Sequence, residues 1–316
     1  MARHLLNLVT RYDNSEPRII SRKLLMIKPA CFGPNSETAK SNVYQASLDG
    51  VTNQKAEGKA REEFDALVTK LREHKIETSI FEDIEHPRKP DAVFPNNWIS
   101  FHGDGRIGLF PMYANIRRME RRNDIIQGLI NEYGYKVEDY TNYENESKFL
   151  EGTGSMVLDR ENKIAYACKS VRTHPDVLNT FCKDFNYRPV LFEAEYCGVP
   201  VYHTNVMMSI TREFAMICVD SITKNKKEVM DTLNETGKQI LYLSEHQTAK
   251  FCGNCLAVSN TEGGLYMCMS STAFSALTDH QKEFIERYYK IIHSPIPTIE
   301  TLGGGSVRCM LAEVYP

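Results

Sequence analysis

The sequence predicts an α/β fold in which short strands alternate with amphipathic helices. Runs rich in Val, Ile, Tyr, Phe and Met are typical of strands, and patterns with one apolar helical face lie between them. Helices recur about every 50–60 residues between strand clusters, and this even spacing indicates internal repeats. The chain has 316 residues, of which 42% are hydrophobic, so it can build a large core.

The predicted strands are short and mostly apolar. They are Leu24–Lys28, Ile76–Phe81, Trp98–His102, Ile107–Phe110, Met156–Asp159, Ile164–Cys168, Val190–Phe192, Val206–Ile210, Phe214–Val219, Gln239–Leu243, Gly264–Met269 and Arg308–Val314.

Five helices are predicted between these strands. They cover about Ala56–His74, Arg118–Tyr133, a segment after Thr173, Lys224–Gly237 and a segment that begins near Thr278. Pro175 fits the first turn of the third helix, where a missing N–H costs nothing. Thr278 is a suitable N-cap for the fifth, because its hydroxyl can accept a hydrogen bond from a free backbone N–H.

No Gly-, Ser- or Pro-rich linker interrupts the pattern. We therefore expect one domain over residues 24–316, preceded by a polar N-terminal extension, residues 1–23. The extension lacks the apolar segment and cleavage site of a signal peptide.

Charge and composition bear on the partners of the protein. The formal net charge is −3 and the sequence pI is about 6.3. Nucleic-acid and membrane partners usually need a basic surface, so we expect neither. No apolar run reaches the length of about 18 residues that a transmembrane helix requires. A homo-oligomer is left open.

The nine cysteines form no dense, regular framework, which favours free thiols in a reducing cytoplasm. One Cys-x-x-Cys pair, Cys252 and Cys255, has no second pair to complete a four-ligand zinc site. We expect no metal and no cofactor.

Four segments combine glycine, polar side chains and predicted strand starts. The first, Gly303–Met310, is a glycine run that leads to Cys309. Glycines let the backbone approach another group closely. The segment could be a tight turn before a buried strand, or it could present a nucleophilic thiol.

The second and third segments could supply acid–base chemistry. Val201–Met208 places His203 before a predicted strand, flanked by Thr204 and Asn205. Histidine exchanges protons near neutral pH, although a lone histidine is usually structural. Phe149–Met156 carries Glu151 just before a strand, where glutamate is uncommon. An exposed turn would also explain that residue.

The fourth segment, Pro90–Trp98, holds Asp91, Asn96 and Asn97. These residue types favour turns, but they could equally ring a polar ligand. Together the four segments supply a nucleophile, an acid–base group, an orienting carboxylate and amide ligands.

The order of these motifs resembles the pentein superfamily, also called the amidinotransferase/arginine deiminase superfamily. The resemblance rests on Asp91, Phe94 and Asn97, on Glu151-Gly152-Thr153-Gly154, on Ser170-Val171-Arg172-Thr173, on His203-Thr204-Asn205 and on Gly303–Met310. Within the superfamily the chain looks most like the citrulline-utilisation hydrolases, or citrulline ureidases. That similarity lies in Pro29–Gly33, Glu37–Ala39, Asn42, Tyr44-Gln45, Phe94–Trp98 and Arg117–Arg122.

The resemblance covers residues 24–316 and implies a five-bladed α/β propeller of pseudo-fivefold ββαβ repeats. It implies that Cys309 is the nucleophile, that His203 is the general acid and base, and that Glu151 grips a substrate nitrogen and positions His203. The implied substrate ligands are Asp91, Asn96 and Asn97 at the guanidino or ureido end, Arg118 and Arg172 at the amino-acid carboxylate, Asn42 from a loop, and Asn205.

The implied reaction is attack of the Cys309 thiolate on the central carbon of the substrate, helped by the imidazolium form of His203.

Arginine deiminases carry an aspartate where Asn97 stands. A neutral amide suits a neutral ureido group, because it can both donate and accept hydrogen bonds. We therefore expect cleavage of citrulline to ornithine, carbon dioxide and ammonia. Arginine dihydrolase, arginine deiminase, amidinotransferase and a non-catalytic pentein binding protein remain alternatives.

Overall fold

The computed structural model describes residues 19–39, 41–46 and 52–315. Most of the predicted extension, residues 1–23, lies outside this part of the chain. Ile20 and Ser21 are already buried, and the Ser21 hydroxyl donates to the Val314 carbonyl at 2.8 Å. Packing of the described chain therefore begins ahead of residue 24.

Helices and strands alternate along the chain, as predicted. The strands are β1 (Lys23–Lys28), β2 (Glu77–Glu82), β3 (Ile99–His102), β4 (Arg106–Leu109), β5 (Lys136–Asp139), β6 (Met156–Asp159), β7 (Ile164–Cys168), β8 (Arg188–Tyr196), β9 (Val199–Pro200), β10 (Met208–Ile210), β11 (Phe214–Ile217), β12 (Ile222–Lys224), β13 (Gln239–Tyr242), β14 (Leu256–Ser259), β15 (Leu265–Ser270), β16 (Lys290–Ser294) and β17 (Ala312–Val314).

The helices vary from single turns to the long α2. They are α1 (Ser36–Ala39), α2 (Asn53–Glu73), η1 (Pro95–Asn97), α3 (Asn115–Arg118), α4 (Asn123–Tyr133), η2 (Thr141–Glu146), α5 (Gly152–Ser155), α6 (Pro175–Phe185), α7 (Thr204–Met207), α8 (Lys226–Glu235), α9 (Glu245–Ala249), α10 (Ser271–Ala276), α11 (Asp279–Glu286), α12 (Pro297–Gly303) and η3 (Val307–Met310).

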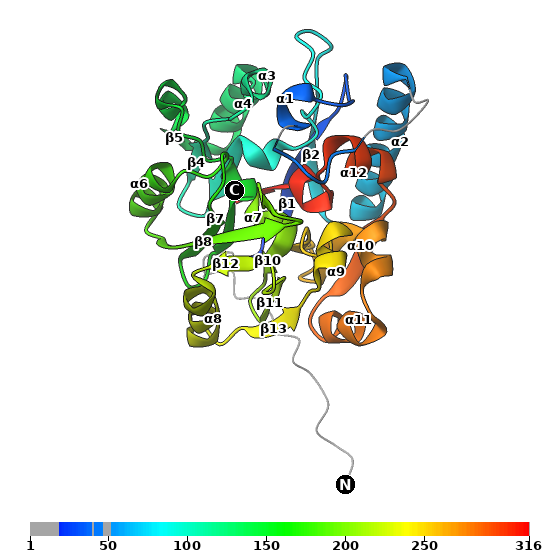
Figure 1. Ribbon diagram of the computed structural model, residues 1–316. Helices are drawn as coiled ribbons and strands as arrows, with labels where there is room; N and C mark the ends of the chain where they lie inside the picture. The colour runs from blue at the N-terminus through cyan, green and yellow to red at the C-terminus, as the bar shows by residue number, and fades with distance from the viewer. Residues whose placement is uncertain (1–18, 40, 47–51, 316) are drawn as a thin grey trace.

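The described strands form five separate sheets. Their orders are β17–β1–β2, β3–β4–β5, β6–β7–β8–β12 with β9 on β8, β10–β11–β13, and β14–β15–β16. Each sheet contains an antiparallel pair followed by a helix and a strand parallel to the second member of the pair. In the third sheet, β12 and β9 add two more antiparallel pairs with β8. In the first sheet, the antiparallel pair joins the two ends of the chain. In Figure 1, helices α2, α4, α6, α8 and α11 lie around the outside.

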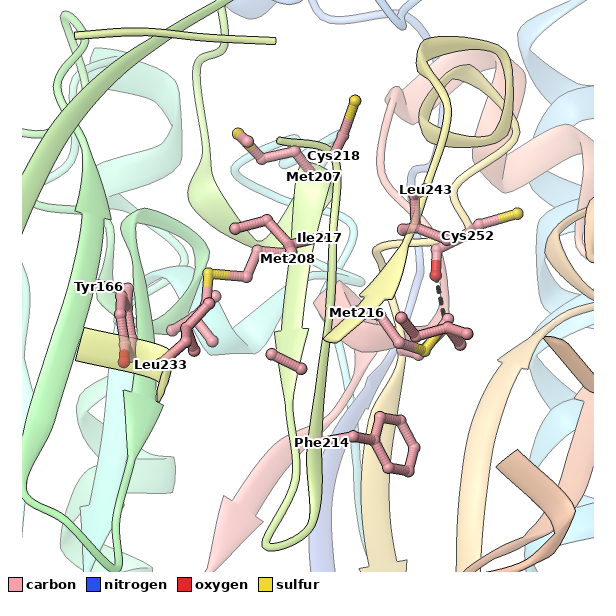
Figure 2. Close-up of a cluster of buried hydrophobic side chains, with 14 of the residues drawn as sticks. Tyr166, Met207, Met208, Phe214, Met216, Ile217, Cys218, Leu233, Leu243 and Cys252 are labelled. Atoms are coloured by element: carbon pink, nitrogen blue, oxygen red, sulfur yellow. Dashed lines mark hydrogen bonds between the residues drawn. The ribbon is translucent and has the colours of Figure 1, made fainter. Parts of the chain in front are cut away.

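The core is built from the inner faces of these sheets and the apolar faces of the helices. Phe64, Leu67 and Leu71 of α2 are fully buried, at the three- and four-residue spacing of one helical face. The largest cluster of buried side chains gathers around β10 and β11, where Met208, Met216 and other residues interlock (Figure 2). No described helix is both long enough and apolar enough to cross a membrane.

Several predicted elements have different bounds in the structure. The helix predicted over Arg118–Tyr133 is two helices, α3 and α4, separated by four residues that contain two arginines. The strands predicted over Val206–Ile210 and Arg308–Val314 both begin later, because a single helical turn occupies the start of each segment. Strands β5, β9, β12, β14 and β16 were not predicted. The burial pattern of β5 shows why, since its four residues are largely exposed and lack an apolar alternation.

A largely buried charge network fixes the end of the chain behind Cys309. Glu313 of β17 accepts hydrogen bonds from Arg308 at 2.9 Å and from Arg160 at 3.4 Å. Arg308 also donates to the Leu311 carbonyl at 2.8 Å. Burial opposes ionisation of Glu313, but the two arginines outweigh it and lower the pKa of Glu313 to about 2.

We expect Glu313→Gln to destabilise the protein by about 3 kcal/mol, because it leaves two arginines without their buried carboxylate. Because the pKa of Glu313 is lower in the folded protein than in the unfolded chain, its carboxylate stabilises the fold when the pH is above the unfolded pKa. This contribution is lost as the pH falls toward about 2. Urea unfolding at neutral and acidic pH should show a smaller loss of stability on acidification in Glu313→Gln than in the unchanged protein. Equal unfolding free energies at neutral pH would contradict the prediction.

Candidate functional site

Four short turns carry most of the predicted site residues. Each turn comes just before the first strand of a sheet: η1 before β3, α5 before β6, α7 before β10, and η3 before β17. The η1 turn packs against both α5 and η3, and α5 packs against α7. Residues far apart in the sequence therefore meet at one place.

His203 and Glu151 form a buried pair at the centre of this place. The Nε2 atom of His203 lies 2.7 Å from Oε2 of Glu151, and both side chains are buried. Gly154 allows this approach, because a Cβ there would lie 2.8 Å from Nδ1 of His203 and 2.4 Å from Nδ2 of Asn97. The small residues after Glu151 are thus needed for space.

Two arginines surround the Glu151 carboxylate. Arg172 approaches its Oε2 atom to 3.5 Å and Arg117 to 3.8 Å, and the Tyr113 N–H donates to Oε1 at 3.0 Å. Burial alone would raise the pKa of Glu151, but Arg172, His203 and Arg117 together hold it well below its ordinary value. Glu151 is therefore a carboxylate at neutral pH.

His203 is neutral at the same pH. Burial is the largest influence and lowers its pKa to about 4, with Arg172 and Arg117 adding to the effect and Glu151 opposing it. Nε2 faces a carboxylate, which only accepts, so Nε2 carries the proton and Nδ1 carries the lone pair. His203 is therefore ready to act as a base, and the imidazolium that the resemblance implies beside the thiolate would form when His203 takes a proton from Cys309.

Cys309 lies in η3 rather than at the start of a strand. Its thiol is buried, and the side-chain amide of Asn205 donates to Sγ at 3.4 Å. Cys309 and His203 line the same cavity. The cavity is lined by Thr38, Asn42, Asp91, Phe94, Asn97, Arg117, Arg172, Tyr202, His203, Gly303, Gly305 and Cys309. Its free space is about 10 Å³, which is room for about one water molecule.

The segment around α1 covers this cavity. Asn42 donates to the carbonyl oxygens of Gly303 and Gly304, both at 3.3 Å. Arg172 donates to the Thr38 carbonyl at 3.0 Å and to the Ser41 hydroxyl at 2.8 Å. These contacts close the cavity in the present conformation.

Asp91 also lines the cavity, next to the α1 segment. Its Oδ2 atom accepts from Asn35 at 2.7 Å, whereas its buried Oδ1 atom has no hydrogen-bond partner among the described residues. Burial raises the pKa of Asp91, although Arg117 and Asn35 oppose this shift. An unpaired acceptor at the wall of a cavity can bind a ligand N–H.

The structure brings together most, but not all, of the predicted site residues. Six of them line the cavity: Cys309, His203, Asp91, Asn97, Arg172 and Asn42. Glu151 lies behind His203, and Asn205 touches Cys309. Asn96 is buried beside Asn97 without lining the cavity. Arg118 lies elsewhere, since its Nε donates to the Met112 carbonyl at 3.1 Å and its side chain is 30% exposed beside Glu144.

Arg117 was not predicted, yet it lines the cavity in place of Arg118. Its guanidinium donates to Glu120 at 2.8 Å and to Oδ1 of Asn97 at 2.9 Å. Adjacent residues on a helical turn point about 100° apart, so only one of the two arginines can face inward. The sequence contains four arginines within Arg117–Arg122 and offers no signal that singles out this one.

Metal ligands are not clustered in the described residues, where no group of three or more His, Cys, Asp or Glu side chains could hold an ion.

A sequence model of the family described as N,N dimethylarginine dimethylhydrolase, eukaryotic, matches residues 28–316. No curated protein sequence matches the chain significantly.

Similar folds occur among solved structures. The substrate-bound N-terminal domain of ArgZ, an arginine dihydrolase from cyanobacteria, is 17% identical with a TM-score of 0.71, and the match covers 93% of this chain and 99% of that one. AgrE with ornithine and NAD+ is 17% identical with a TM-score of 0.70, over 92% of this chain and 38% of that one. A dimethylarginine dimethylaminohydrolase bound to S-methyl-L-thiocitrulline is 16% identical with a TM-score of 0.64, over 93% and 99%. At these identities the likeness supports the fold.

The buried His203 makes stability depend on pH. Its folded pKa of about 4 lies below its ordinary value of 6.5, so the unfolded chain binds the proton more readily. Its contribution to stability is complete above pH 6.5 and is lost as pH falls toward 4, with a full size of roughly 3 kcal/mol.

We expect His203→Gln to lose less unfolding free energy than the unchanged protein between these two pH values, as measured by urea unfolding. His102 is also buried with a pKa lowered mainly by burial, so His102→Gln provides a matched comparison. Parallel loss of stability in the unchanged protein and His203→Gln would contradict the assignment of a neutral His203.

Proposed function

Because this chain belongs to the family of eukaryotic N,N-dimethylarginine dimethylhydrolases, we propose that it is a cysteine hydrolase acting on the guanidino or ureido carbon of a free amino acid. The family and the structural relatives are members of the pentein superfamily, so the superfamily resemblance is confirmed. The citrulline branch within it remains a proposal. We also propose that residues 24–316 form one catalytic domain in the cytoplasm, and that its five sheets are the blades of a propeller.

The observation that carries the proposal is the single cavity shared by Cys309 and His203. Glu151 orients the histidine from behind, and Arg172 and Asp91 offer opposite charges at the cavity wall. A small zwitterionic substrate presents both a carboxylate and a row of N–H donors. Arginine binds carboxylates through parallel hydrogen bonds, and a carboxylate accepts N–H donors. The present cavity is too small for an amino acid, so binding requires it to widen.

The chemistry follows from the protonation states. Neutral His203 takes the thiol proton of Cys309, and the resulting thiolate forms a bond to the central carbon of the substrate. The carbon–nitrogen bond then breaks, and the imidazolium returns the proton to the departing amine. His203 next takes a proton from water, whose oxygen replaces sulfur on the carbon and releases Cys309. With a ureido substrate the product is a carbamic acid, whose remaining carbon–nitrogen bond breaks to give carbon dioxide and the second amine. Glu151 stabilises the imidazolium in each half of the reaction.

Asn97 supports citrulline as the substrate. Arg117 only donates, so the atom of Asn97 that faces it must be the oxygen. The Asn97 nitrogen therefore donates to Oδ1 of Asn96 at 2.9 Å, which leaves the buried Asn96 nitrogen without a partner among the described residues. Asn97 itself lines the cavity, and the second N–H of its amide could donate to a ureido oxygen, an acceptor that a guanidinium lacks.

Arginine is the second candidate substrate, and Asp91 favours it. The unpaired, buried Oδ1 atom of Asp91 at the cavity wall suits the N–H donors of a guanidinium. The arginine dihydrolase ArgZ has a similar fold, and conversion of arginine to ornithine would use the same Cys309 and His203 chemistry.

We expect the purified protein to release ornithine and ammonia from citrulline, and we expect Cys309→Ala to abolish the release. Citrulline, arginine and dimethylarginine should be supplied separately, and ornithine, citrulline and ammonia measured. Ornithine from arginine would make the enzyme a dihydrolase, and accumulated citrulline would make it a deiminase or a dimethylarginine hydrolase. No product from any of the three would contradict the proposed function, unless an added acceptor amine revealed amidine transfer.

We expect Asn97→Asp to shift the preference from citrulline toward arginine by about tenfold or more in kcat/KM, because a carboxylate pairs with a guanidinium and opposes a ureido oxygen. The ratio of kcat/KM for the two substrates is the measurement. Asn96→Asp is a useful comparison, since Asn96 does not line the cavity. An unchanged ratio in Asn97→Asp would remove the argument for citrulline.

A further inference from the structure

The Cys252–Cys255 pair, which the proposed reaction does not use, brackets a turn that reaches the nucleophile. Both thiols are free and buried, and Gly253 and Asn254 lie between them. The turn leads directly into β14, the first strand of its sheet. It thus occupies the position that η1, α5, α7 and η3 hold before the first strands of the other sheets. Each of those turns brings a predicted site residue to the centre.

Asn254 is the residue that this turn delivers. Its side chain is fully buried, and its Nδ2 atom lies 2.8 Å from the Asn205 carbonyl oxygen and 3.3 Å from Sγ of Cys309. A carbonyl oxygen only accepts hydrogen bonds, so the atom that faces it must be the NH₂ nitrogen. One N–H is used on that carbonyl, and the second points to sulfur. The orientation of this amide is therefore fixed by its neighbour.

Asn205 adds a second donor on the same sulfur. Its Nδ2 atom lies 3.4 Å from Sγ of Cys309. The Oδ1 atoms of Asn205 and Asn254 are buried and have no hydrogen-bond partner among the residues that the structure describes. Two neutral N–H donors that converge on one sulfur suit an acceptor, which is the thiolate rather than the thiol. Hydrogen bonds to an ionised acceptor are about twice as strong as neutral ones.

The surrounding contacts hold the turn in place. Gly253 lies against the α7–β10 junction, where a Cβ would come within 2.6 Å of the Val206 carbonyl oxygen. The Cys255 thiol donates to the Cys252 carbonyl at 3.1 Å, and the Cys252 thiol donates to the Ala273 carbonyl at 3.4 Å. Figure 2 shows Cys252 among the buried apolar side chains. The two cysteines therefore act as small buried side chains that close the turn.

We propose that Asn254 is a catalytic residue that, together with Asn205, donates hydrogen bonds to the Cys309 thiolate, and that the Cys252–Cys255 turn serves to position it. The inference rests on the proposed function for the nucleophilic role of Cys309. It adds hydrogen bonds to the charge that forms on sulfur when His203 takes the thiol proton, at a place where Arg117 and Arg172 are engaged by carboxylates.

The test is alkylation of Cys309 by iodoacetamide, followed by peptide mass spectrometry over a range of mildly acidic to alkaline pH. It uses the full chain, with Cys309→Ala as the background. Asn254→Ala removes the donor, and Asn254→Leu removes it while keeping the side-chain volume, so the second variant carries the test if the first does not fold. Both variants keep the other titratable groups around the cavity, which are Asp91, Arg117, Arg172, Tyr202 and His203.

We expect both variants to alkylate roughly 10- to 100-fold more slowly at neutral pH and to recover at alkaline pH, as the loss of a hydrogen bond to a charged group predicts. With a substrate that is turned over, kcat should fall by a similar factor while KM changes little. Asn260→Ala is the matched control, because Asn260 is buried but bonds to the His74 carbonyl and the Tyr266 hydroxyl, away from Cys309.

Alkylation rates and pH profiles equal to those of the unchanged protein would overturn the proposal, and so would an equal loss in Asn260→Ala. If none of the offered amino acids is turned over but alkylation still depends on Asn254, the proposed function fails while the role of Asn254 stands.

Discussion

The buried carboxylate of Glu151 is the interaction on which the site depends. A carboxylate with no exposed surface is costly unless cations and donors surround it. Here Arg172, Arg117, His203 and the Tyr113 N–H all contact it. These partners come from separate segments of the chain, so one charge ties them together. The same charge compensates the cost of burying two arginines beside a substrate cavity.

The repeated architecture explains why these segments meet. A turn before the first strand of each sheet lies where the sheets come together, and neighbouring turns pack against one another. Such close packing leaves no room for side chains at certain positions, which is why Gly154 and Gly253 carry none. The fold thus collects polar groups from distant parts of the sequence at one centre, while the apolar faces of the helices are buried farther out.

Charge within the cavity is balanced rather than absent. Arg117 is neutralised by Glu120, Asp91 and Glu151, and Arg172 by Glu151. The groups that contact the sulfur are the neutral amides of Asn205 and Asn254, so we infer that directed hydrogen bonds stabilise a thiolate there, in addition to the imidazolium that forms when His203 takes the thiol proton. Burial keeps His203 neutral before that transfer, because burial lowers the pKa of His203 more than the nearby Glu151 raises it.

The sequence by itself determined the α/β class, most of the strands, five helices and the identities of Cys309, His203, Glu151, Asp91, Asn97 and Arg172. The helices and strands follow from local apolar patterns, whereas the site residues follow from unusual residue types beside glycines together with the resemblance to the pentein superfamily, which alone indicated Arg172. The missed strands are short, and β5 is also largely exposed, whereas β14 is buried but only four residues long. Only the tertiary structure decided that Arg117 rather than Arg118 lines the cavity, that His203 is neutral, and that Asn254 reaches the sulfur. Packing decides which way a side chain on a turn points, how far the pKa of a buried group shifts, and whether residues 55 positions apart touch. Local sequence patterns do not encode packing.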